Sequence, residues 1–204
     1  MTILQQIIIL APPFLFALTI HEYSHGMVAF RLGDPTARDL GRLTLNPLKH
    51  LDPLGVLAFI IMKIGWAKPV PVNPRYFRNP LKDMIWVALA GPAANLFTAI
   101  ASSLLAELLM LFAPLIPQPI LFPLLQMLGA SIWINLILAV FNLLPIPPLD
   151  GSKVLMGLLP ARQAASYSRL EPFGFIILLV LFYTGILQKI LMPIIGLAER
   201  MISG

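Results

Sequence analysis

Two histidines four residues apart carry the clearest chemistry in this sequence. They belong to the pentapeptide HEYSH at 21–25, which has the form HExxH. On an α-helix, side chains at this spacing project from one face, so His21 and His25 can share a metal ion. Glu22 lies about 100° further round the helix, beside that face, where its carboxylate can polarise a metal-bound water without binding the metal itself. The spacing therefore predicts a metal site with Glu22 as the general base.

A catalytic zinc needs a third protein ligand and one open position for water. The chain has no cysteine, so the third ligand must be a His, Asp or Glu. The candidates away from the basic segment 31–82 are Glu107, Asp150, Glu171 and Glu199. Asp150 follows the helix-breaking run PIPP and precedes a glycine, so unwound backbone can aim its side chain inward. We predict that His21, His25 and Asp150 bind one ion; iron or cobalt would also suit this ligand set.

The rest of the sequence indicates that these residues lie in a membrane. Hydrophobic residues make up 58% of the chain and charged residues 11%, with a mean hydropathy of +0.87. A spanning helix needs about 20 apolar residues. We predict an all-α polytopic membrane protein, a single domain over residues 1–204, with about four spans at 3–30, 84–112, 124–144 and 172–187. Charged residues inside a span are functional candidates because burying them in lipid is costly.

The connection at 31–82 differs from the spans, because it is rich in Pro, Gly and basic residues. Its apolar stretch 54–62 is too short to cross a bilayer and predicts a re-entrant or interfacial piece. The run GWAKPVPVNPRYF at 65–77 alternates Val with Pro, which predicts a short membrane-associated β-hairpin. An unpaired edge of that hairpin could bind an extended peptide. His50 has no suitably spaced partner, and we interpret it as structural or at the surface.

Charge distribution predicts the orientation in the bilayer. Segments 31–82 and 151–171 hold nine and three of the 14 Lys and Arg residues. Placing both segments in the cytoplasm puts the N-terminus outside. His21 follows Ile3 by about 27 Å of helix, near the cytoplasmic end of a core about 30 Å thick, and Asp150 follows the third span on that side. The basic residues are scattered between apolar runs, which fits lipid headgroups and disfavours nucleic acid.

Several motifs together resemble the site-2 protease family of intramembrane zinc metalloproteases. They are HEYSH, GRLTLNP at 41–47, GWAKPVPVNP at 65–74, AGPAAN at 90–95 and NLLPIPPLDG at 142–151. The resemblance implies one Zn²⁺ per chain held by His21, His25 and Asp150, with Glu22 as the catalytic base. It also implies that Asn95 lies near the substrate or the oxyanion.

The resemblance further implies a transmembrane protein as the substrate, cleaved near the cytoplasmic face of a prokaryotic plasma membrane during regulated intramembrane proteolysis. The chain resembles a minimal member, because it lacks a PDZ insertion between the second and third spans and a C-terminal CBS module. The alternative function is a metal-binding membrane transporter or sensor that cuts no bond. A transporter favours internal repeats and polar residues in several spans, whereas here the polar residues converge at one level.

Overall fold

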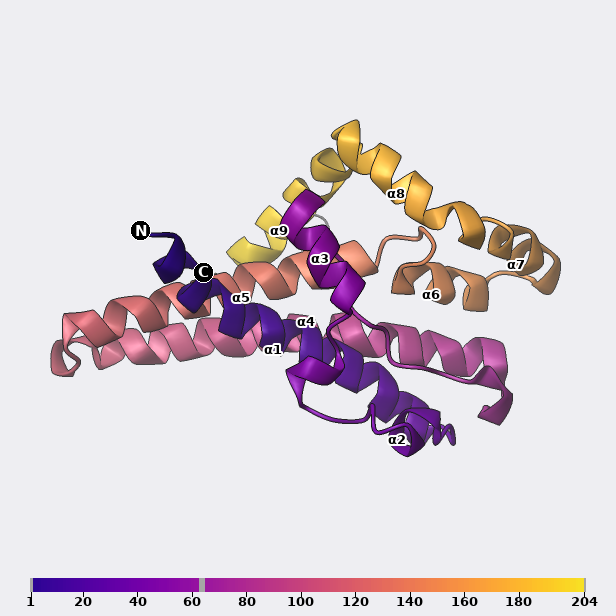
Figure 1. Ribbon diagram of the computed structural model, residues 1–204, viewed down its shortest axis with the longest axis horizontal. Helices are drawn as coiled ribbons and strands as arrows, with labels where there is room; N and C mark the ends of the chain where they lie inside the picture. The colour runs from indigo at the N-terminus through magenta and orange to yellow at the C-terminus, as the bar shows by residue number, and fades with distance from the viewer. Residues whose placement is uncertain (1, 63–64, 204) are drawn as a thin grey trace.

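The computed structural model describes residues 2–62 and 65–203, and it is built from helices (Figure 1). Three long helices form its centre: α1 (Ile3–Arg31), α4 (Pro80–Leu111) and α5 (Gln118–Asn142). Each of them packs against the other two. The shorter helices are α2 (Thr36–Asp39), α3 (Pro53–Met62), α6 (Asp150–Leu158), α7 (Ala161–Ser168), α8 (Gly174–Tyr183) and α9 (Ile186–Ser203).

The described residues contain four helical stretches long and apolar enough to cross a membrane: Leu4–Arg31, Pro80–Leu111, Gln118–Asn142 and Ala161–Tyr183. They confirm an all-α integral membrane protein with four candidate spans. The first three agree with the predicted spans to within a few residues. The third begins at Gln118, earlier than predicted, because Pro119 lies in the first helical turn, where a missing N–H costs no intrahelical bond.

The fourth stretch differs from the predicted span at 172–187. It starts 11 residues earlier, at Ala161, and consists of α7, a 3₁₀ turn at Glu171–Phe173 and α8. It ends at Tyr183, because Gly185 adopts a φ of +73° and turns the chain into α9. The last helix, α9, packs against α5 through Leu187, Leu191 and Ile195.

Small residues set the distance between the central helices. Ala17 and Ala29 of α1 and Ala88 and Ala99 of α4 have 0–1% of their surface exposed. Side chains of this size let helix backbones approach closely, which is the usual basis of packing between membrane helices. The connection between α4 and α5 covers only 112–117, so no domain is inserted there.

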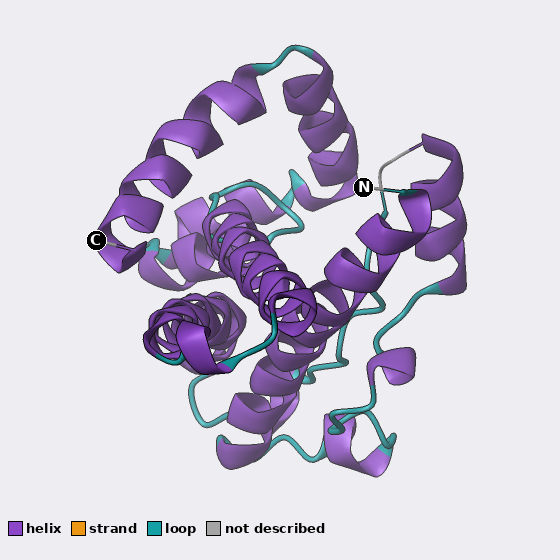
Figure 2. Ribbon diagram, turned by 90° about the vertical axis from the view of Figure 1, so that its left-hand side faces the viewer, coloured by secondary structure: helices purple, strands orange, loops and turns teal. Residues whose placement is uncertain are grey.

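The predicted β-hairpin at 65–77 is wrong. Within the described residues there is no strand, and Figure 2 contains only helices and loops. In that part of the chain the one β-type pairing is an isolated bridge between Leu51 and Ala67. Pro69 and Pro71 have no N–H, and the amides of Val70 and Asn73 donate to side chains of the protein.

A re-entrant loop at 54–62 is likewise not supported, since those residues lie in the ten-residue helix α3. Lys63 and Ile64, which also belong to the predicted connection at 31–82, lie outside the described residues. We call residues 66–73 the extended segment. It runs past α1 and is held there by side chains, as described below.

Candidate metal centre

The two histidines of HEYSH lie one turn apart on α1, and both are buried. Their rings meet edge to face, with centroids 4.6 Å apart, and their Nε2 atoms are 3.0 Å apart. The helix therefore presents both imidazoles to one point, as the spacing predicts.

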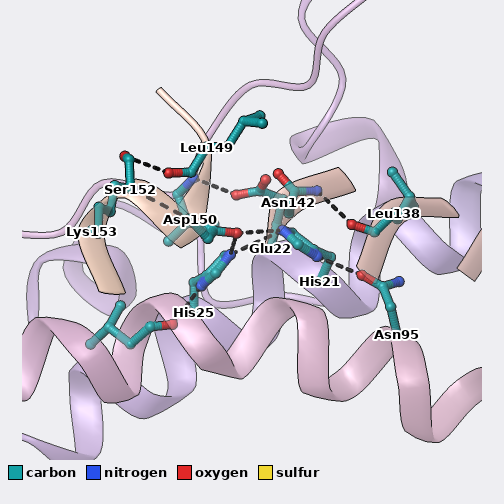
Figure 3. A network of polar contacts seen from close by, with 12 residues as sticks. His21, Glu22, His25, Asn95, Leu138, Asn142, Leu149, Asp150, Ser152 and Lys153 are labelled. Carbon is teal, nitrogen blue, oxygen red and sulfur yellow. Dashed lines mark hydrogen bonds and ion pairs between the residues drawn. The ribbon is translucent and has the colours of Figure 1, made fainter. Parts of the chain in front are cut away.

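Asp150 reaches the same point from the first turn of α6. Its Oδ2 lies 3.2 Å from His21 Nε2 and 3.1 Å from His25 Nε2 (Figure 3). The prolines after Asn142 end α5, and the chain turns back so that α6 packs against α4. Gly151 is required by this turn, because a Cβ at that position would lie 2.2 Å from the carbonyl oxygen of Leu143. The structure thus brings together all three predicted ligands.

The partners of the two Nδ1 atoms define which ring nitrogen carries the proton. His25 Nδ1 lies 2.7 Å from the carbonyl oxygen of Val87, which can only accept a hydrogen bond. His21 Nδ1 lies 2.5 Å from Asn95 Oδ1. Both Nδ1 atoms therefore donate, so each ring in its neutral form keeps a lone pair on Nε2. This is the usual arrangement of metal-binding histidines, in which the second nitrogen donates to an oxygen of the protein.

Three lone-pair atoms consequently face one another without a proton between them. They are His21 Nε2, His25 Nε2 and Asp150 Oδ2, and the buried Oδ2 accepts no hydrogen bond. Atoms bound tetrahedrally to zinc at 2.0–2.2 Å lie about 3.3 Å from one another, close to the 3.0–3.2 Å separations here. A cation relieves the repulsion between the lone pairs, so this donor set fits a zinc ion.

The charge of Asp150 also suits a cation. Although burial raises the pKa of this carboxyl, the Lys153 ammonium stabilises its charged form and the pKa lies well below its usual range. Lys153 Nζ lies 3.7 Å from the other oxygen, Oδ1. Asp150 is therefore a carboxylate at neutral pH.

Gly91 of α4 forms the floor of the site. A Cβ on this residue would lie 2.4 Å from His25 Nε2 and 2.6 Å from His21 Cε1. Both distances are shorter than any real Cβ contact, so only glycine lets α4 pass directly beneath the two rings.

Glu22 lies beside the three lone-pair atoms and is not one of them (Figure 3). Its side chain is buried, and its Oε2 accepts a 2.8 Å hydrogen bond from the amide of Val70. This bond ties the extended segment to α1 next to the histidines. Two further bonds hold the same segment: Arg42 Nη2 donates to the Lys68 carbonyl, and the Asn73 amide donates to Asp34.

Asn95 is fully buried, and both the oxygen and the nitrogen of its side-chain amide are hydrogen-bonded within the protein. Its oxygen lies at His21 Nδ1, and its nitrogen donates to Ala17 O and Asn135 Oδ1. These contacts support a role in orienting His21. The predicted contact of Asn95 with substrate or oxyanion stays a prediction.

The remaining candidate residues do not join the site. Within the described part of the chain, His21, His25 and Asp150 are the one group of His, Asp and Glu side chains that could hold a metal. Glu107 and Glu171 are exposed. His50 is buried, and its Nε2 lies 2.8 Å from the Thr44 carbonyl, which agrees with the structural interpretation.

Sequence reasoning missed four contributors: the Val70 amide, the Val87 carbonyl, Gly91 and Asn135. The first two are backbone groups, and no side-chain pattern reveals them. Asn135 was detectable, because a polar residue in a span as apolar as α5 is costly and marks a functional candidate.

Comparison with known proteins agrees with this geometry. The sequence profile of Peptidase family M50 matches residues 118–184, which include Asp150. "Putative zinc metalloprotease YwhC" of Bacillus subtilis is 40% identical over 191 residues, covering 88% of this chain and 82% of that protein. The proteins named "Putative zinc metalloprotease Rip2" of Mycolicibacterium smegmatis and Mycobacterium tuberculosis are 32% and 33% identical, over 86% and 82% of this chain. The chain spans 66% and 64% of their lengths. No solved structure matches the chain.

Membrane-length helices around a buried His-His-Asp cluster define an integral membrane metalloprotein. The chain belongs to peptidase family M50, the site-2 protease family, whose curated relatives bear the names of zinc metalloproteases.

Proposed function

We propose that this protein is an intramembrane zinc endopeptidase that hydrolyses a peptide bond in or next to a transmembrane helix of a membrane-protein substrate. The observation that carries the proposal is the convergence of His21 Nε2, His25 Nε2 and Asp150 Oδ2 within 3.2 Å, with the Glu22 carboxylate beside them. Three protein ligands leave a fourth position for water, which is typical of catalytic zinc sites.

Each side chain has a defined task in this proposal. His21, His25 and Asp150 hold one zinc ion, which when bound acidifies water from a pKa of about 15.7 to about 7 and polarises a peptide carbonyl. Glu22 accepts a proton from the attacking water and passes it to the leaving nitrogen as the C–N bond breaks. The 2.8 Å bond from the Val70 amide holds the Glu22 carboxylate in place for both transfers.

The location of the site decides how substrate and water reach it. The histidines lie in the last third of α1, close to the polar segment that follows Arg31. We propose that residues 1–204 act as one domain in a prokaryotic plasma membrane, with the N-terminus outside and the site near the cytoplasmic face. The segment 31–82 holds nine of the chain's 14 Lys and Arg residues, and this excess of positive charge supports the orientation. A substrate helix must unwind to expose its carbonyls, since in a helix these are hydrogen-bonded.

The test is cleavage of a synthetic transmembrane peptide by the purified chain in detergent with zinc. Glu22→Gln removes the proton acceptor and leaves the three ligands, so cleavage falls at least about 100-fold while bound zinc stays at one per chain. Glu107→Gln makes the same chemical change on an exposed side chain of α4 and leaves cleavage unchanged.

The outcomes separate protease from transporter. Cleavage by wild type and its loss in Glu22→Gln support the protease. Zinc flux into vesicles without cleavage by either protein would establish the metal-binding transporter instead. Equal cleavage by wild type and Glu22→Gln would remove Glu22 from the mechanism.

A further inference from the structure

A column of polar side chains continues from His21 into the middle of the helix bundle. Asn95 Nδ2 of α4 donates to Asn135 Oδ1 of α5 at 2.7 Å, and Asn135 Nδ2 donates to the Ser131 carbonyl at 2.8 Å. Ser131 Oγ lies 2.8 Å from Ser102 Oγ of α4. Both amides are fully buried, and both hydroxyls are at least nine-tenths buried. Polar side chains in such an apolar setting are costly unless they are used.

The hydrogen bonds of this column have a fixed direction. The Ser131 carbonyl can only accept, so the NH₂ group of Asn135 must face it, and Asn135 Oδ1 then faces Asn95. Asn95 in turn meets two pure acceptors, Asn135 Oδ1 and the Ala17 carbonyl, at 2.7 and 3.0 Å. Its NH₂ group must point to them, which leaves Asn95 Oδ1 for His21.

The two histidines are therefore oriented by different means. His25 Nδ1 donates directly to the Val87 backbone carbonyl, which cannot rotate. His21 Nδ1 donates to an amide that could flip and present its nitrogen instead. A flipped Asn95 would donate to His21 Nδ1, and the proton of the ring would have to move to Nε2. That tautomer has no lone pair left for a metal.

We propose that Asn135 is a positioning residue of the metal centre: together with the Ala17 carbonyl it orients the amide of Asn95 and so holds His21 in the tautomer with a free Nε2. The proposal deepens the proposed function and depends on it only in assigning the metal centre to His21. A packing role predicts different behaviour, because asparagines also hold membrane helices together by interhelical hydrogen bonds.

Asn135→Asp and Asn135→Leu distinguish the two roles. In this apolar interior the introduced Asp is protonated, so its hydroxyl donates to the Ser131 carbonyl and its other oxygen accepts from Asn95. In Asn135→Leu the new side chain has nearly the same size as Asn and packs as well, but it offers no hydrogen-bond acceptor to Asn95. Positioning predicts that Asp keeps zinc affinity within about threefold of wild type and that Leu lowers it about 10- to 100-fold, the usual effect of losing a ligand's partner. A packing role predicts that any loss of zinc affinity is matched by a loss of stability and that the His21 tautomer does not change.

The second measurement is the histidine tautomer in the zinc-free protein, by ¹⁵N NMR of chains labelled at histidine. The sequence has three histidines, so the signals can be assigned by substitution. We expect the Nε2–H form of His21 to gain population in Asn135→Leu, where only the Ala17 carbonyl still orients Asn95, and the tautomer to stay unchanged in Asn135→Asp. His25 serves as an internal control, since its partner is backbone. Asn135→Ala also removes the acceptor and serves if the Leu variant does not fold.

Thr98→Val is the matched control on α4. Its hydroxyl donates only to the Ala94 carbonyl of its own helix, so its loss should change neither zinc affinity nor the His21 tautomer. The positioning role is overturned if His21 keeps Nδ1–H in both Asn135→Leu and Asn135→Ala, or if Asp lowers zinc affinity more than Leu. Neither measurement uses cleavage, so a wild type that binds zinc but cuts no peptide would refute the proposed function and leave this test intact.

Discussion

The metal centre and the helix α8 are held in place in different ways. Around the histidines, most polar atoms have a named partner and the side chains are buried. On α8 the side chains of Phe175, Ile176 and Val180 are each at least half exposed, and Figure 1 shows the helix standing away from α4 and α5. Only Gly174 of α8 is buried, against the backbone of Pro147.

The metal centre depends on the exact positions of individual atoms, whereas α8 depends only on the apolar character of its surface. A metal site needs its ligand atoms held to within a few tenths of an ångström, and only directed contacts do that. A helix that faces lipid needs only an apolar surface, because every backbone group is bonded within the helix. Substitutions at the centre should therefore change metal binding strongly, whereas those on α8 should change it very little.

The largest effect is expected for Asp150→Ala, which removes one of the three lone-pair atoms. Zinc affinity should fall by more than about 100-fold, since loss of a ligand's partner alone costs about 10- to 100-fold. Isothermal titration calorimetry of the detergent-solubilised chain measures the change. Asp39→Ala, on an exposed residue paired with Arg38, is the control and should keep wild-type affinity. Unchanged affinity in Asp150→Ala would exclude Asp150 as a ligand.

Gly91→Ala should have the next largest effect. The added Cβ meets both rings at 2.4–2.7 Å, so the histidines must shift and zinc affinity should fall about 10- to 100-fold. The matched control is Gly129→Ala on α5, where a Cβ meets nothing within 4 Å. That change should leave affinity unaltered and stabilise the helix by about 0.5–1 kcal/mol. Equal affinities in the two variants would show that the floor of the site can move.

Ile195→Ala examines the apolar cluster in which α9 packs against α5. Ile195 of α9 is 1% exposed and lies in a cluster with Leu136, Leu191 and Ala99. We expect the free energy of unfolding to fall by about 2 kcal/mol, the lower end of the usual range, with zinc affinity unchanged. Thermal unfolding in detergent measures this, with the exposed neighbour Ile194→Ala as the control. A loss of zinc affinity would mean that α9 also supports the centre.

The smallest effect is expected for Ile176→Ala on α8. Ile176 is 59% exposed, so the free energy of unfolding in detergent should change by less than about 0.5 kcal/mol. Zinc affinity should stay the same. A change as large as that of Ile195→Ala would contradict the contrast between α8 and the packed core.

The three ligands could be predicted because each lies in a short motif that can be recognised without knowing the fold. HEYSH specifies two side chains on one helix face, and PIPPLDG specifies a broken helix that ends in a carboxylate. The meeting of Asp150 with the histidines followed from placing both at one level of the bilayer. The Val87 carbonyl and Gly91 could not be predicted, because their contribution depends on how α4 crosses α1.

The extended segment shows why the hairpin prediction failed. Alternating Val and Pro at 69–72 suggested the edge of a strand, but pattern alone does not say where the amides donate. In the structure the Val70 amide meets Glu22, and Asn73 meets Asp34, both buried carboxylates distant in sequence. Long-range side-chain acceptors of this kind replace the partner strand. The predicted fourth span at 172–187 overlaps α8, and the apolar helical stretch of the structure begins earlier, at Ala161.

The separation of Asp150 from the histidine pair along the chain has a consequence for biosynthesis. His21 and His25 leave the ribosome and enter the bilayer about 125 residues before Asp150 is made. During that interval the nascent protein has only two of the three ligands, so it binds zinc weakly. On the proposed ligand set, metal acquisition is therefore a late step, after α4 and α5 have inserted, and the ion cross-links two segments far apart in the sequence, which favours the assembled state over partly inserted ones.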